Sequence, residues 1–145
     1  MSMELVDQVR VALAEFSSAT RLYGLEIGGG GAGLLVEAFA ADEALQALGS
    51  RDLILLSTDA QVSLSGLLEQ PATLAVTLAD GSRSRFSGIV SEAAMLGSFG
   101  GLARYRVRLS PWLWRLGQVR NSRVWQDRTV IEIVDAVFQA HAPLA

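Results

Sequence analysis

The spacing of apolar and polar residues changes along the chain and predicts a helix followed by β-strands. In the first twenty residues, apolar side chains recur at helical spacing opposite charged ones, which predicts an amphipathic helix. Its apolar positions are Leu5, Val9, Ala12, Leu13 and Phe16. From Arg21 to Ile27 and again over residues 34–39 the period is two, which predicts two strands. The glycine run Gly28–Gly31 between them is typical of a hairpin loop.

The middle of the chain predicts an irregular stretch before the next strand. Ala40–Leu48 is rich in alanine and acid and is expected to be a connection, whereas Asp52–Ser57 is expected to be a short buried strand. Ser63–Leu68 is compatible with one helical turn, which ends before Pro71.

An antiparallel meander is the clearest local prediction. Thr73–Leu78 turns at Asp80-Gly81 and returns as Ser84–Glu92. A second glycine turn at Gly97–Gly101 leads into Leu102–Leu109. We therefore expect a mainly β fold, in the α+β sense, with helices at both ends.

The last of these strands has two different faces, an apolar one and a basic one. The apolar face carries Tyr105, Val107 and Leu109, and the basic face carries Arg104, Arg106 and Arg108. Three arginines on one face repel one another unless carboxylates or a partner lie opposite. A solvated face, an acidic neighbouring subunit and nucleic acid are the three interpretations, and the arginines are our candidate partner interface.

A second amphipathic helix is predicted near the C-terminus. Thr129-Val130-Ile131-Glu132 has the form of a capping box, so either Asp127 or Thr129 is the expected N-cap. The apolar stripe of this helix is formed by Val130, Ile133, Val134, Val137 and Phe138.

Composition indicates a folded domain with little material for catalysis. The chain has 145 residues, of which 50% are hydrophobic and 19% are charged, so global disorder and a membrane-spanning helix are both excluded. There is no cysteine and one histidine, and the acidic N-terminus does not predict a secretory signal. Residues 1–80 hold three arginines and eleven acids, and residues 81–145 hold nine arginines and four acids. Such complementary halves are compatible with head-to-tail association of copies. All twelve basic residues are arginine, and genome composition is the favoured explanation for the absence of lysine.

Three further features of the sequence predict neither catalysis nor a cofactor. Gly28, Gly30 and Gly33 satisfy G-x-G-x-x-G, but the residues that follow alternate as a strand instead of opening a helix. His141 follows the last apolar position of the final helix, where a solvated side chain is expected. An enzyme built on Glu92 and His141 is the weakest alternative, and we expect no metal site.

The tryptophans are the remaining candidates. On a strand, Trp112 and Trp114 would share a face and offer a platform for carbohydrate or single-stranded nucleic acid. The flanking leucines favour instead a core or subunit-interface role for Trp112, Trp114 and Trp125.

Several phrases in one order resemble a known family. They are Gln70-Pro71-Ala72-Thr73-Leu74, Phe86-Ser87-Gly88-Ile89-Val90-Ser91-Glu92-Ala93, Gly101-Leu102-Ala103-Arg104-Tyr105-Arg106, Leu109-Ser110-Pro111-Trp112-Leu113-Trp114-Arg115-Leu116, Asn121-Ser122-Arg123-Val124-Trp125-Gln126-Asp127 and Ile131-Glu132-Ile133-Val134. Together they resemble the N-terminal region of the VgrG, or Rhs-element Vgr, spike proteins of type VI secretion, which are similar to phage tail hubs. Trp125 and Arg128 stand where that family more often has Phe and Lys.

The resemblance implies an antiparallel β-barrel of the phage tail-hub type and a structural role. Residues 1–20 would be a helix and linker, and residues 21–145 the first barrel with its following helix, as a fragment of a longer protein. It further implies a homotrimer that joins an Hcp-like hexameric tube to the spike, with effectors carried by a C-terminal region that this sequence lacks. We expect no cofactor, no nucleic acid and no stable membrane insertion. Assembly in the bacterial cytoplasm followed by secretion through the type VI machine is the implied localisation.

Overall fold

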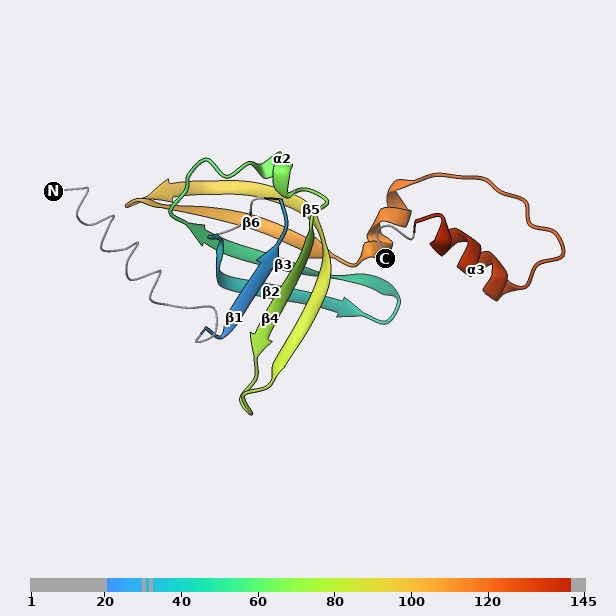
Figure 1. Ribbon diagram of the computed structural model, residues 1–145, viewed down its shortest axis with the longest axis horizontal. Helices are drawn as coiled ribbons and strands as arrows, with labels where there is room; N and C mark the ends of the chain where they lie inside the picture. Colours follow the sequence, from blue (N-terminus) through green and yellow to red (C-terminus); the bar gives the residue numbers. More distant parts are fainter. Residues whose placement is uncertain (1–20, 30, 32, 142–145) are drawn as a thin grey trace. The chain divides into compact units, whose positions relative to one another are not determined.

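The computed structural model describes residues 21–29, 31 and 33–141, and the predicted helix at Leu5–Phe16 lies outside them. Within these residues, six strands form one antiparallel sheet in the order β1-β4-β5-β6-β3-β2 (Figure 1). The strands are β1 (Tyr23–Ile27), β2 (Leu35–Ala44), β3 (Ala47–Ser57), β4 (Pro71–Thr77), β5 (Arg83–Phe99) and β6 (Leu102–Ser110). The mainly β prediction is confirmed.

The first and last strands of the sheet approach each other through side chains. The rings of Tyr23 on β1 and Phe39 on β2 meet edge to face, with centroids 5.3 Å apart. β1 pairs with β4 and β2 pairs with β3, which makes them the two edge strands of the sheet. No ladder joins β1 to β2 in the described part of the chain. The sheet is therefore a half-barrel with a seam that aromatic packing bridges.

The prediction that the glycine run forms a hairpin loop is wrong, because β1 and β2, the strands on either side of the run, are the opposite edges of the sheet. Gly28 donates its N–H to the carbonyl of Pro71, at 3.1 Å. Gly29 has φ +69°, and a Cβ there would lie 2.2 Å from the carbonyl oxygen of Gly66. At this position the glycine permits close packing of the loop against the chain around Gly66.

The irregular stretch predicted at Ala40–Leu48 is also wrong, because these residues extend β2 and β3 into a long hairpin that turns between Ala44 and Ala47. Alanine and acidic residues are weak strand formers, so pairing overrides local preference here. The predicted meander is confirmed in β4, β5 and β6, with β5 extending to Phe99.

The core lies on one side of the sheet, where Leu34 and Leu67 from the connections also pack. Its fully buried side chains are Tyr105, Leu53, Leu55, Leu67, Leu74, Leu109, Val90 and Val107. Tyr105 also orders the connection after β3, since its hydroxyl donates to the carbonyl of Asp59 at 2.9 Å and accepts from the N–H of Val62 at 3.4 Å. The predicted helical turn follows as α2 (Leu64–Leu67), with Ser63 as N-cap.

The chain divides into two compact units between Pro111 and Trp112. The second unit holds a 3₁₀ helix, η1 (Trp112–Gln118), and the predicted C-terminal helix, α3 (Val130–Gln139). Thr129 is the N-cap of α3, and both hydrogen bonds of the capping box are present. The rings of Trp112 and Phe138 pack edge to face at 5.0 Å, which links η1 to α3.

Candidate functional site

The three arginines of the candidate interface lie on the outer side of β6, opposite the core. Tyr105, Val107 and Leu109 are buried on the inner side, as the alternation predicts. The arginine side chains keep between 34% and 58% of their surface exposed. They are therefore held by their strand while remaining accessible to water or to a partner.

Arg108 is bound by carboxylates from both neighbouring strands. Its Nε and Nη2 donate to the two oxygens of Asp52 on β3, at 3.1 and 3.0 Å, and its Nη1 donates to Glu92 on β5 at 2.7 Å. Hydrogen bonding to Asp52 is the main cause that raises the pKa of Arg108 above its ordinary value. Arg108 consequently stays charged and is fixed in orientation from two sides.

Glu92 joins Arg108 to Arg106, whose Nη2 donates to it at 3.0 Å. A β-bulge puts this carboxylate in place: the register passes from Val90 opposite Leu109 to Glu92 opposite Arg108. Ser91 is the extra residue of the bulge; in an unbroken register Ser91, and not Glu92, would lie opposite Arg108.

Arg104 is paired in the same manner with Glu37. Its Nε and Nη2 donate to the two carboxylate oxygens at 2.9 and 2.6 Å, and this hydrogen bonding raises the pKa of Arg104. Glu37 also lies in a bulge, between Val36 and Ala38 in the register with β3. Strict alternation predicts that Glu37 shares a face with Phe39, and this is wrong, because the bulge lets Val36 and Phe39 both pack on the core.

The arginine face is therefore compensated within the chain. Its three guanidinium groups meet the three carboxylates of Glu37, Asp52 and Glu92, so its formal charge is zero. Exposed ion pairs add little to stability, but a bidentate network fixes where each charge points. The alternation in the sequence places the three arginines on one face. It does not reveal their pairing with Glu37 and Asp52, because that pairing depends on the order of the strands and, for Glu37, on a bulge.

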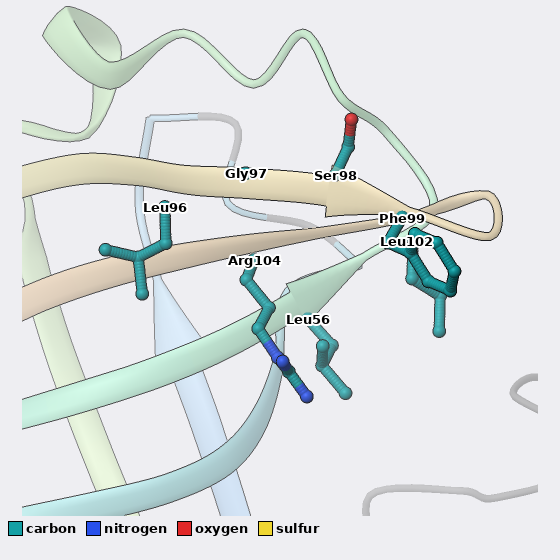
Figure 2. A pocket seen from close by; sticks show the side chains of 7 residues that line it. All are labelled: Leu56, Leu96, Gly97, Ser98, Phe99, Leu102 and Arg104. Atoms are coloured by element: carbon teal, nitrogen blue, oxygen red, sulfur yellow. The ribbon is translucent and has the colours of Figure 1, made fainter.

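A groove with apolar walls adjoins Arg104 near the end of the sheet (Figure 2). It encloses about 570 Å³ and is lined by Leu56, Leu96, Gly97, Ser98, Phe99, Leu102 and Arg104. Figure 2 shows Leu56, Leu96 and Arg104 pointing to the same side of the sheet, while Ser98 points to the other. Phe99 is 93% exposed, which is unusual for a side chain of this size.

The tryptophans do not form the platform that a strand would give. Trp112 and Trp114 lie on η1, where residues two apart do not share a face, so the strand geometry on which the platform alternative depended is not present at these positions. Both side chains are half-buried. Trp125, also half-buried, lines a cavity of about 290 Å³ together with His141 and Val137. A core or interface role for these three residues stays a prediction.

Two residues considered for catalysis lie in different compact units: Glu92, in the first unit, is engaged by Arg106 and Arg108, and His141 lies in the second. No cluster of three or more metal-binding side chains occurs in the part that the structure describes. Gly28 and Gly33 precede strand β2, so the context of a dinucleotide fingerprint is missing. Among the same residues, no helix is long and apolar enough to span a membrane.

Comparison with known proteins identifies the fold and the relatives. Residues 42–145 match the family described as phage tail baseplate hub (GPD). The chain is 41% identical over 88 residues to the type VI secretion system spike protein VgrG1b of Pseudomonas aeruginosa, covering 61% of this chain and 12% of the relative. It is 36% identical over 124 residues to VgrG1c of the same organism, covering 86% of this chain and 17% of the relative.

A solved structure has the same fold. It is the E. coli c3393 protein, described as a component of the type VI secretion system that is structurally similar to the T4 bacteriophage tail proteins gp27 and gp5. The TM-score is 0.73 at 25% identity, and the superposition covers 84% of this chain and 33% of that one. The chain thus spans a small part of the length of each relative.

Proposed function

The chain belongs to the phage tail baseplate hub family, and from this premise we propose that it is a structural hub domain of a type VI secretion spike. The single observation that carries the proposal is the hub-family match over residues 42–145, supported by the similarity to VgrG1c over 86% of the chain. In this role the half-barrel is a building block of a homotrimer and has no enzymatic activity of its own.

The proposed partner is a hexameric tube protein of the Hcp type, which the hub would join to the spike. A tube adaptor needs a rigid sheet with charges held in fixed positions, and the network around Arg104, Arg106 and Arg108 supplies both. Because the face is compensated internally, an approaching acidic surface would exchange one carboxylate partner for another. Binding through such exposed pairs should weaken as salt is added.

Effectors would be carried by parts of the longer protein outside this chain. The proposed route is assembly in the cytoplasm, followed by export with the spike through the secretion machine. Support for this route comes from the VgrG relatives, which are spike proteins of the type VI secretion system, and the proposal concerns the whole protein.

A mixing experiment tests the tube contact. The 145-residue chain and the tube protein from the same bacterium are combined and their masses are measured by light scattering, at low and at high salt. We expect a complex that Arg106→Glu weakens. Arg85→Glu is the control, because Arg85 is also an exposed arginine but lies on β5, where its ion pair among the described residues is a long one with Glu26, at 3.9 Å.

If Arg106→Glu and Arg85→Glu bind the tube protein equally well, the arginine face is not the contact surface for the tube. Absence of any complex, for this chain and for a longer form containing the rest of the protein, would overturn the tube-adaptor function.

A further inference from the structure

The first unit exposes two apolar features at opposite ends of one sheet. One is the groove beside Arg104, next to the turn that joins β5 to β6. The other is the tip of the β2–β3 hairpin, which turns between Ala44 and Ala47. The pairing of β3 with β6 runs from Arg51 opposite Leu109 to Ser57 opposite Ala103, so the two turns lie at opposite ends of this ladder.

The groove is suited to receive one apolar side chain and one carboxylate. Its walls include Phe99 and Leu96, which are 93% and 53% exposed. Arg104 uses Nε and Nη2 for Glu37, and its Nη1 makes no hydrogen bond within the described residues. One guanidinium nitrogen at the groove therefore remains available as a donor.

The hairpin tip offers the matching groups. Leu45 is fully exposed at 106%, and Leu48 is 50% exposed. Asp42, three residues before Leu45, pairs with Ser50 through the strand ladder, and its exposed carboxylate forms no ion pair or hydrogen bond with a described residue. Glu43 also lies at this tip and pairs with Arg51, whose side chain is only 12% exposed. The tip is thus an apolar projection bordered by acid, whereas the groove is an apolar hollow bordered by a guanidinium.

We propose that Leu45 of one copy of this chain occupies the groove of a second copy, with Asp42 facing Nη1 of Arg104. The occupant is a second copy because the tip offers an exposed apolar side chain for the apolar groove and a carboxylate for the Nη1 donor of Arg104, and because each copy carries both features. The contact is heterologous, so its repetition gives a closed ring or an open chain according to the rotation between copies. The inference rests on the proposed function, in which copies of the hub domain stand side by side.

Disulfide trapping tests this contact, because the chain contains no cysteine. Leu45→Cys and Leu96→Cys are made as separate variants, one with a size tag, and are mixed under mild oxidation. The matched control replaces Leu45→Cys by Leu78→Cys, since Leu78 is another exposed leucine, next to the β4–β5 turn. We expect the mixed disulfide between positions 45 and 96 to form at least about tenfold faster than the control, because docking raises the effective concentration.

A second pair of variants separates contact from general reactivity. Adding Asp42→Arg to the Leu45→Cys chain should return the rate to that of the control, and adding Arg104→Glu to the Leu96→Cys chain should do the same. Combining both changes should restore the fast rate. Equal rates for the test and control mixtures would overturn the proposal, whether the groove is empty or is covered by another segment of its own chain.

The outcome is distinguishable from failure of the proposed function. A tube complex without preferential disulfide formation would overturn the tip-in-groove contact alone. Preferential disulfide formation without a tube complex would support the contact and count against the tube-adaptor function.

Discussion

Arg108 and Asp52 are 56 residues apart in sequence and face each other directly across β6 and β3, where two parallel hydrogen bonds of 3.1 and 3.0 Å join them. Because Glu92 reaches Arg108 from the opposite strand, one guanidinium ties β3 to β5 through β6. On the outer side of the half-barrel, ion pairs thus connect neighbouring strands, while on its inner side the strands are held by packing of apolar side chains.

A double-mutant cycle on this pair should give a small coupling energy. Arg108 and Asp52 are each about one third exposed, so solvent screens them and the expected coupling is about 0.5–1 kcal/mol. The cycle uses Arg108→Ala, Asp52→Ala and the double variant, with the free energy of unfolding measured by urea denaturation. The coupling should fall as salt is added. A coupling above about 3 kcal/mol would indicate a desolvated pair and contradict this assignment.

Removing the Tyr105 hydroxyl should destabilise the fold without opening a cavity. Tyr105→Phe keeps the buried ring and deletes the bonds to Asp59 and Val62, so the expected loss is about 1–2 kcal/mol. The measurement is urea denaturation, with hydrogen exchange at Val62 as the local readout. Tyr23→Phe is the matched control, because no hydrogen bond to its hydroxyl is seen among the described residues. Equal stability of the two variants would contradict the role given to the Tyr105 hydroxyl.

Gly88 should be far less replaceable than Gly24, although both lie in strands. A Cβ on Gly88 would lie 2.4 Å from the carbonyl oxygen of Ser110, whereas a Cβ on Gly24 would meet nothing closer than 3.8 Å. Gly88→Ala must displace backbone and should cost about 1–3 kcal/mol, while Gly24→Ala should be nearly neutral. Thermal or urea unfolding of the two variants checks this. Similar losses would mean that strand propensity, not the contact with β6, governs both sites.

Much of the fold could be predicted from local pattern. Period-two alternation gave the meander of β4, β5 and β6, and the capping box located the start of α3 at Thr129. Alternation also placed Arg104, Arg106 and Arg108 opposite the core. These features depend on residues within a few positions of one another, so the sequence expresses them directly.

What could not be predicted depends on strand order and on irregular register. The glycine run spans from one edge of the sheet to the other, and no local signal separates that crossing from a hairpin. Glu37 and Glu92 reach the arginines through bulges, which break the alternation used to assign faces. The candidate interface was therefore found as a row of arginines, and its carboxylate partners were missed.

The start of α3 should be sensitive to acid. The N–H and hydroxyl of Thr129 donate to Glu132, at 2.8 and 3.0 Å, and the bond from the N–H is the main cause that lowers the pKa of this carboxyl below its ordinary 4.5. A carboxyl whose pKa is lower in the folded state than in the unfolded state stabilises the fold at pH values above its ordinary pKa. That stabilisation is lost as the pH falls through the lowered pKa. The helix start should hence be intact at neutral pH and loosen below the ordinary pKa. An NMR titration of the Thr129 amide checks the midpoint, with Glu132→Gln as the control that keeps an acceptor and removes the titration. A midpoint at or above the ordinary value would contradict the capping bond as the cause.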